Sequence, residues 1–376
     1  LAAGAVTGTS FNGIPFYTGD ANSIYTHDVS GTDDTATGNT AFGIEAMDAI
    51  TTGDNNTAIG YQALSALTTG TVNTAVGQDT LTINTTGSYN TAMGPTALDA
   101  NTTGNYNTGI GYRALSANID GDKNTVLGYN AMEANTTADN SVAIGAHALQ
   151  ANTTGINNTA VGYDALNDNV TTSGNTAIGN QSLSKSIADD NTAVGYLALQ
   201  LNTTGAYNTA IGRSALTANT TAAANTAVGR LALTTNTTGH SNTAVGYNSL
   251  RYNQNAVGNT AVGHTSLQAN TTASNNTALG YTALLTNTTA ANNTAVGAAA
   301  LYTNNGAANT AVGKDALKTN STGDSNVAIG KGAMELNSTG AQNTALGYAA
   351  LDANTTANNN TAIGFTAMSA NTTGTQ

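Results

Sequence analysis

The chain has 376 residues and no Cys, and Lys, Arg, Asp and Glu make up only 8% of it, with a formal net charge of −12. The lack of Cys excludes disulfides and thiolate metal sites, and the lack of any apolar run of about 18 residues predicts no membrane insertion by this segment. The nine Lys and Arg residues are scattered without a basic stripe, so we expect no binding to nucleic acid.

Residues 1–38 precede a repeat and do not follow its pattern. They are rich in aromatic residues, including Phe11, Phe16, Tyr17 and Tyr25. A stack of repeats exposes an unpaired strand edge at its end, so we interpret 1–38 as an N-terminal cap. The alternative is an attachment segment that forms a head-to-tail joint.

Residues 39–376 contain one short unit, repeated twenty times. A Gly recurs every 17 residues from Gly43 to Gly364, with 16-residue steps only at Gly179 to Gly195 and at Gly297 to Gly313. The unit reads N-T-A-V-G-Y-x-A-L-x-x-N-T-T-G-x-x, and we number it so that this Gly is position 5. A fixed short period predicts a stacked repeat architecture. We expect the two short units to differ in a corner and to keep their strands.

Alternating residues within the unit predict short strands. Positions 1 to 6 alternate with a period of two, and the short segment at positions 8 to 11 is interpreted as a second strand. Successive coils would then pair in parallel with a spacing of about 4.8 Å. This gives an all-β parallel β-roll (a β-solenoid) of 20 short coils with a length of roughly 95 Å. Position 4 is always apolar and position 9 is always Leu or Met. We expect them to face each other inside the roll, with the Asn at position 1 forming an amide ladder.

Such a roll has a thin core, because only two sizeable apolar residues per unit face inward. Small residues at positions 3, 5 and 8 would let another backbone approach closely. We therefore expect this Ala and Gly face to pack against other copies of the chain, around a three-fold axis.

Two segments resemble a known family. Residues 140–145 read N-S-V-A-I-G and residues 326–330 read N-V-A-I-G. Both resemble the head repeat of trimeric autotransporter adhesins of the YadA type, and the longer N-T-A-V-G-Y form resembles the repeat arrays of phage tail fibres. The resemblance covers 39–376, although the adhesin unit is nearer 14 residues. It implies a left-handed, trimeric β-roll in an elongated extracellular fibre on a cell or virion surface.

Few residues are candidates for chemistry. Asp pairs at 120–122, 189–190 and 33–34 could bind Ca²⁺, but they lack the oxygen density of known calcium loops, and we interpret them as turns. His27, His147, His240 and His264 have no nucleophile or carboxylate at a meaningful spacing. We therefore expect no enzyme activity, no catalytic, cofactor-binding or metal-binding residues, and no cofactor.

Two recurring features are open to a second interpretation. Tyr recurs at position 6 and could form a stripe that stacks on sugar rings, but we favour packing along the corner that shields the interior. The Asn-Thr-Thr sequences that begin at Asn84, Asn101, Asn135, Asn152 and Asn202 match the glycosylation acceptor on surface corners, but we favour turn chemistry.

These observations predict a structural extracellular rod that projects or provides a surface-binding region, with surface glycans or a host receptor as its partner. The alternatives are a filament of subunits stacked end to end and, more weakly, a polysaccharide-processing enzyme on a β-solenoid.

Overall fold

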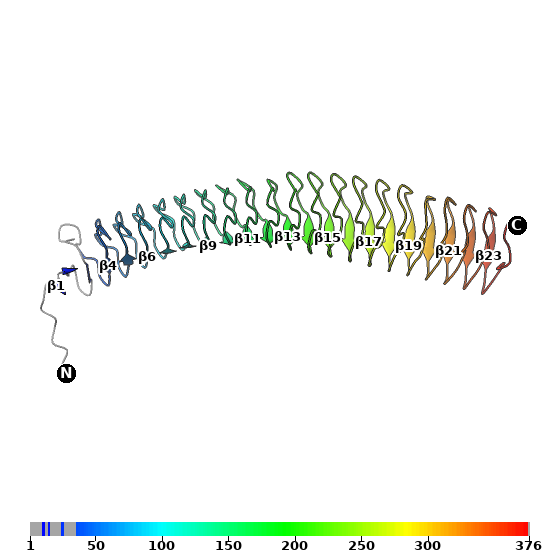
Figure 1. The fold of residues 1–376 in the computed structure, drawn as a ribbon, viewed down its shortest axis with the longest axis horizontal. Helices are drawn as coiled ribbons and strands as arrows, with labels where there is room; N and C mark the ends of the chain where they lie inside the picture. Colours follow the sequence, from blue (N-terminus) through cyan, green and yellow to red (C-terminus); the bar gives the residue numbers. More distant parts are fainter. Residues whose placement is uncertain (1–9, 12–13, 16–23, 26–34, 375–376) are drawn as a thin grey trace, which may run out of the picture. The chain divides into compact units, whose positions relative to one another are not determined.

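A computed structural model describes residues 10–11, 14–15, 24–25 and 35–374. Within these residues the regular elements are all strands, and 21 of them are parallel and stack into a β-solenoid of about 19 turns (Figure 1). The all-β class and the parallel roll are therefore confirmed. The chain divides into two compact units, Leu1–Gln181 (unit 1) and Ser182–Gln376 (unit 2), which we describe separately.

The strands are short and follow the repeat. β1 (Ser10–Phe11) and β2 (Ile14–Pro15) form a separate antiparallel pair. The parallel strands of unit 1 are β3 (Ile24–Tyr25), β4 (Thr40–Phe42), β5 (Thr57–Ile59), β6 (Thr74–Val76), β7 (Thr91–Met93), β8 (Thr108–Ile110), β9 (Thr125–Leu127), β10 (Val142–Ile144), β11 (Thr159–Val161) and β12 (Thr176–Ile178). Those of unit 2 are β13 (Thr192–Val194), β14 (Thr209–Ile211), β15 (Thr226–Val228), β16 (Thr243–Val245), β17 (Thr260–Val262), β18 (Thr277–Leu279), β19 (Thr294–Val296), β20 (Thr310–Val312), β21 (Val327–Ile329), β22 (Thr344–Leu346) and β23 (Thr361–Ile363).

From β4 onward, each strand covers positions 2 to 4, and within each unit successive strands pair in register at these positions. In β14 and β15, for example, Thr209 lies beside Thr226, and Ala210 lies beside Ala227. Hydrogen bonds between coils continue past the strand, as from the amide of Gly229 to the carbonyl of Ile211 at 2.7 Å. Each coil is therefore bonded to its neighbour over much of its circuit.

The prediction of a second strand at positions 8 to 11 is wrong, because this segment is a turn. Ser214 at position 7 and Leu216 at position 9 have φ angles of 56° and 50°, in the left-handed region. The amide of Leu216 still donates to the carbonyl of Ala232 in the next coil, at 3.0 Å. The segment thus bonds between coils as a strand does, but its backbone is not extended.

The interior is formed by the opposite face of the strand from the predicted one. Ala210 at position 3 is fully buried, whereas Ile211 at position 4 is 40% exposed. The core therefore consists of the alanines at positions 3 and 8 and the Leu or Met at position 9. At position 3 of one coil stands Gly109, where an added Cβ would lie 3.1 Å from Cδ1 of Leu98. Because one Leu per coil already fills this narrow section, most coils place a methyl group at position 3.

The Gly at position 5 is required by the next coil and not by another chain. Gly347 has a φ of +139°, and a Cβ on it would lie 2.3 Å from the carbonyl oxygen of Gly364, one coil further on. With the alanines inside and this Gly against its own neighbour, the prediction that the Ala and Gly face meets other chains is wrong.

The predicted Asn ladder at position 1 is confirmed. Oδ1 of Asn242 accepts from the backbone amide of Asn259 at 2.9 Å, while its Nδ2 donates to the carbonyl of Ala256 at 2.8 Å. The Asn at position 12 forms a second buried ladder that we predicted only as turn chemistry. There, Nδ2 of Asn253 donates to Oδ1 of Asn236 at 2.8 Å. The polar ladders thus occupy part of the interior and link successive coils.

The short coil that begins at Asn293 keeps its strand, as predicted. Thr294 pairs with Thr310 in register, and the missing residue is taken from the corner. Nδ2 of Asn304 reaches the carbonyl of Gly306, two residues on, whereas Asn320 of the next coil reaches that of Gly323, three residues on.

Two described parts of the N-terminal segment contact the stack. Ile24 of β3 pairs in parallel with Thr40 of β4, and the carbonyl of Thr37 accepts from the amide of Asn55 at 2.8 Å. The residues of the predicted cap or attachment segment other than 10–11, 14–15, 24–25 and 35–38 lie outside the described residues, and its role stays a prediction.

Candidate functional site

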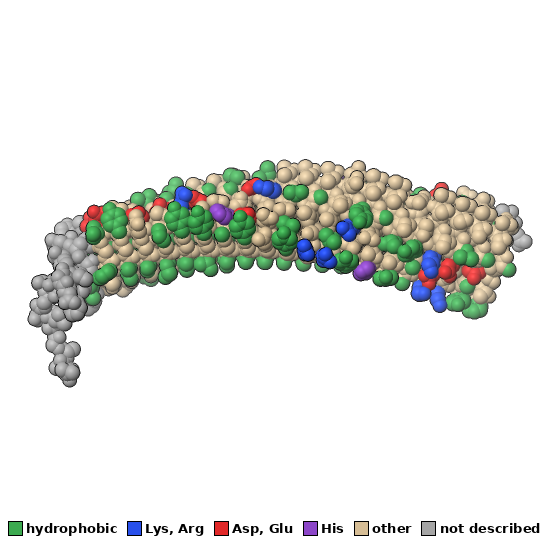
Figure 2. Space-filling model, in the orientation of Figure 1, with side chains coloured by type: hydrophobic (Ala, Val, Ile, Leu, Met, Phe, Trp, Pro, Cys, Tyr) green, Lys and Arg blue, Asp and Glu red, His purple; other side chains and the backbone are tan. Residues whose placement is uncertain are grey.

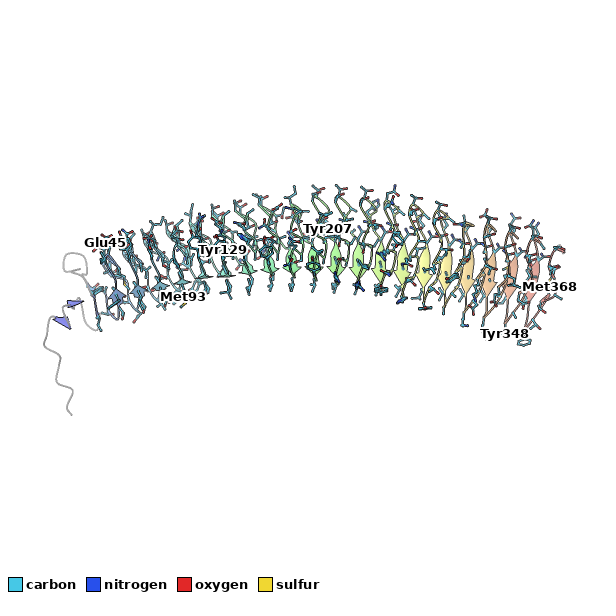
Figure 3. All side chains as sticks on the ribbon, viewed as in Figure 1. Glu45, Met93, Tyr129, Tyr207, Tyr348 and Met368 are labelled. Atoms are coloured by element: carbon cyan, nitrogen blue, oxygen red, sulfur yellow. The ribbon has the colours of Figure 1, made fainter. Side chains whose placement is uncertain are left out.

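In each unit, position 4 forms a row of outward-facing apolar side chains, which we call the aliphatic row. In unit 1 it runs from Phe42 to Ile178 and in unit 2 from Val194 to Ile363. Its members are half-buried or exposed, up to 51% at Phe42 and 67% at Ile363. Figure 2 shows this row in unit 1 as a line of green side chains, and Met93 projects away from the coil in Figure 3. The row comes from the residues that we predicted to be core.

The Tyr residues at position 6 are exposed, and several of them pack against the ring of a neighbouring coil along the corner. Tyr112 and Tyr129 stack on each other with ring centroids 5.5 Å apart, and Tyr129 meets the edge of His147 at 5.4 Å. A second pair at position 17, Tyr89 and Tyr106, stacks at 4.9 Å. The exposed Tyr residues at position 6 are Tyr61, Tyr112, Tyr129, Tyr163, Tyr196, Tyr247, Tyr281 and Tyr348.

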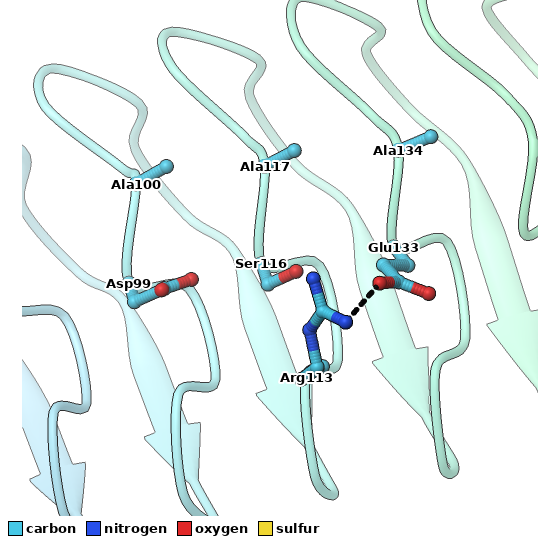
Figure 4. A pocket seen from close by; sticks show the side chains of 7 residues that line it. All are labelled: Asp99, Ala100, Arg113, Ser116, Ala117, Glu133 and Ala134. Atoms are coloured by element: carbon cyan, nitrogen blue, oxygen red, sulfur yellow. Dashed lines mark ion pairs between the residues drawn. The ribbon is translucent and has the colours of Figure 1, made fainter.

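One corner of unit 1 carries a hollow of about 420 Å³ between successive coils (Figure 4). Arg113 lies in it and pairs with Glu133 at 2.8 Å. Burial raises the pKa of the Asp99 carboxyl above its usual range, against the opposing effects of hydrogen bonds to backbone amides and of the Arg113 charge. A second hollow of about 370 Å³ shares Asp99 and Ala100 with it and is lined also by Asp79.

The acidic corners serve the fold. Oδ1 of Asp122 accepts from the amide of Asn105 at 2.7 Å, and the amide of Asp122 donates to Oδ1 of Asp139 at 2.7 Å. The carbonyl of Asp189 accepts from Nδ2 of Asn191. In the described part of the chain, no three His, Asp or Glu side chains gather in a way that could hold a metal ion. Asp33 and Asp34 lie outside the described residues.

The described histidines contact their neighbours in the corners. Nδ1 of His147 lies 3.1 Å from Oε1 of Gln150, and Nδ1 of His240 lies 3.2 Å from Oγ of Ser241. The His264 ring lies between those of Tyr247 and Tyr281. His27 lies outside the described residues.

The Asn-Thr-Thr corners do not present their Asn side chains to solvent, contrary to the glycosylation hypothesis. Asn84, Asn101, Asn135, Asn152 and Asn202 are fully buried in the second ladder. An amide that is enclosed and hydrogen-bonded between coils cannot carry a glycan while the coil is folded. The open choice between glycan acceptor and structural corner is therefore decided for these five residues in favour of structure.

The basic residues are less scattered in the structure than in the sequence. Arg213 and Arg230 occupy position 6 of adjacent coils in unit 2, beside exposed aromatic rings. The sequence reasoning missed this alignment because the two residues lie 17 apart, and only the period of the repeat shows that they are neighbours.

Comparison with known proteins provides no relative from which a function could be inferred, so a function has to be argued from the features above. No protein-family model matches the chain, and no curated protein matches it. Among the described residues no helix is long and apolar enough to cross a membrane.

Proposed function

We propose that this chain forms the shaft of an extracellular fibre on a cell or virion surface, where it projects or provides a surface-binding region. The observation that supports this function is the aliphatic row. It gives each coil an uncharged apolar side chain on its outer face, from Phe42 to Ile178 in unit 1 and from Val194 to Ile363 in unit 2.

The row suits assembly of several copies along their length. Soluble monomers rarely expose a contiguous apolar patch larger than a few hundred Å², and such patches mark interaction sites. Oligomers of one chain bury equivalent surfaces around a symmetry axis. Three copies that meet at this row would cover it, the number three being taken from the resemblance to trimeric adhesins. This face replaces the Ala and Gly face that the sequence suggested.

Acidic substitutions in the row test the assembly. Val228 and Val245 are half-buried neighbours on β15 and β16, and their side chains point out of the coil. Val228→Asp combined with Val245→Asp is expected to leave the circular dichroism spectrum unchanged. It should convert a trimer into monomers, as measured by light scattering, because burying unpaired carboxylates at an interface is costly.

Thr238→Asp, on an exposed corner away from the row, provides the matched control and should stay trimeric. A monodisperse monomer of the unaltered chain, or a trimer that survives both acidic substitutions in the row, would contradict this assembly.

Electron microscopy and an activity assay separate the shaft from its alternatives. A shaft gives rods of one fixed length, whereas a self-assembling filament gives particles of many lengths. Release of sugars from polysaccharide by the purified chain would instead support an enzyme.

A further inference from the structure

Charge is divided unequally between the two units. Unit 2 contains seven Lys and Arg and six Asp and Glu, whereas unit 1 contains two and fifteen. Within unit 2 no acidic residue occurs from Asn191 to Lys314, a stretch that holds Arg213, Arg230 and Arg251. This part of the rod is locally positive in an acidic chain.

Position 6 of six successive coils in this stretch forms a column of planar side chains, which we call the aromatic–arginine column. All six are exposed, and Figure 2 shows blue and purple side chains next to green ones on this face of unit 2. The column consists of Tyr196, Arg213, Arg230, Tyr247, His264 and Tyr281.

The groups of the column form two stacks, one of Tyr196 with Arg213 and one that runs from Arg230 to Tyr281. Cζ of Arg213 lies 5.6 Å from the centroid of Tyr196, and Cζ of Arg230 lies 5.7 Å from that of Tyr247. The ring of Tyr247 stacks on His264 at 5.2 Å, and His264 stacks on Tyr281 at 5.4 Å. Stacking covers the ring faces and leaves the hydroxyl, imidazole and guanidinium edges as outward hydrogen-bonding groups.

The two arginines are not neutralised within unit 2. They occupy adjacent coils, about 4.8 Å apart along the stack, and no carboxylate of the surrounding stretch is available to pair with either. Arg213 stacks on the ring of the preceding coil and Arg230 on the ring of the following coil, so the two guanidinium groups offer two cationic sites along the rod to successive anionic groups of one polymer. Arg is suited to carboxylate and sulfate groups because its planar fork donates two hydrogen bonds.

We infer that the aromatic–arginine column binds a linear acidic polysaccharide that lies along the rod. The anionic groups would be bound by Arg213 and Arg230, and sugar hydroxyls would be bound by the Tyr hydroxyls above and below. The inference rests on the proposed extracellular role and gives the shaft a ligand.

The spacing and stacking favour a polysaccharide over a nucleic acid. Single-stranded nucleic acid binds through aromatic faces on which its bases stack, but neighbours in the column cover the faces of Tyr247 and His264. The column offers two adjacent cations among neutral donors, which matches a polymer with charges spaced between hydroxyls.

Isothermal titration calorimetry of the full chain tests the inference with polygalacturonate, dextran sulfate, neutral dextran and single-stranded DNA. Arg213→Gln combined with Arg230→Gln should weaken binding of an acidic polysaccharide at least tenfold, with an unchanged circular dichroism spectrum. The matched control is Lys314→Gln combined with Lys331→Gln, which removes two charges from the same position of other coils and should change affinity less than about threefold. Preference for polygalacturonate or dextran sulfate tells carboxylate from sulfate recognition.

The inference is overturned if neither acidic polysaccharide binds, if both double variants lose affinity equally, or if the DNA binds more tightly than either. Light scattering on the same samples keeps this outcome separate from the proposed function. If the chain forms trimeric rods that bind no polysaccharide, the inferred ligand is wrong and the proposed role as a fibre shaft still stands.

Discussion

Besides the backbone hydrogen bonds, two residues in each coil hold successive coils close together. The Gly at position 5 lets two backbones touch, as Gly347 does at Gly364, and the Asn at position 1 bonds to its own coil and to the next, as Asn242 does. Both roles repeat along each unit, so a substitution in one coil tests the role of the same position in the other coils.

Gly347→Ala is expected to destabilise the protein strongly. The Cβ would lie 2.3 Å from a backbone oxygen, and the φ of +139° is one that only Gly adopts readily. Gly364→Ala separates the two effects, because Gly364 has a φ of +130° but its added Cβ meets nothing closer than 3.8 Å. It should cost about 1 to 3 kcal/mol from strain alone, and Gly347→Ala should cost more. Equal urea midpoints would show that contact between coils is unimportant.

Asn242→Ala is expected to lower the free energy of unfolding by about 1 to 3 kcal/mol, because it leaves the buried backbone amide of Asn259 without its acceptor. The carbonyl of Ala256 loses one bond but still accepts from Nδ2 of Asn253 at 3.1 Å. Asn242→Ser should recover part of this, since Ser141 occupies the same position naturally and its Oγ accepts from the amide of Asn158 at 3.3 Å. Urea denaturation of both variants measures the difference, and an alanine variant as stable as the serine variant would contradict the ladder.

At the scale of the strand, the sequence predicted the pairing and missed the orientation. The spacing of the Gly residues predicted parallel coils in register, and the structure has Thr209 beside Thr226. Hydrophobicity favoured position 4 as core, but a shift of one residue along a strand exchanges its faces. Volume decides here, because the narrow coil holds one Leu per turn and admits the smaller Ala210 in place of Ile211.

Two further features of the coil were not predicted from the sequence, because both depend on the three-dimensional path of the coil. Leu216 adopts a left-handed φ, which bulky residues rarely do, so local propensity favoured a strand there. Arg213 and Arg230 are neighbours only across one period. The sequence therefore indicated which residue types the candidate surfaces contain, but it did not indicate which of these residues lie side by side.

A corner ion cluster in unit 2 gives the fold a pH dependence. Lys314 and Lys318 lie 2.8 and 3.1 Å from the oxygens of Asp315, whose side chain is only 12% exposed. The hydrogen bond from Lys314, followed by that from Lys318, holds the pKa of Asp315 below its usual range. The hydrogen bond that Lys318 donates to Asp315 raises the pKa of Lys318 above its usual range.

Asp315→Asn should therefore destabilise the protein by about 0.2 to 1 kcal/mol at neutral pH, since both lysines are substantially exposed. A lowered Asp pKa stabilises the folded state above the ordinary value of 3.8, and this is lost as pH falls through the folded pKa. A raised Lys pKa stabilises below 10.5 and is lost as pH rises through the folded pKa. Unfolding followed at several pH values should show the difference disappearing at both extremes, and a difference independent of pH would refute it.

At the scale of the molecule, stability should depend on whole coils. Deletion of 225–241 removes one complete coil and joins Ala224 to Asn242, so strands, ladders and faces keep their order. The product should fold with the same circular dichroism per residue, because repeat stability is close to a sum over neighbours. Deletion of 225–232 removes a strand but keeps the following corner, and it should lower the urea midpoint far more. Similar midpoints for the two deletions would mean that the period does not govern the fold.

The uniformity of the aliphatic row also has a consequence for how copies align lengthwise. A neighbour that slides by one coil, about 4.8 Å, meets nearly the same Thr and Val surface as before. Lengthwise alignment in the proposed assembly must then depend on the members that break the uniformity, such as the larger Phe42 and Met93. The repeated apolar side chains allow contact along the whole row, but only the side chains that differ in size can fix the lengthwise register of one copy against another.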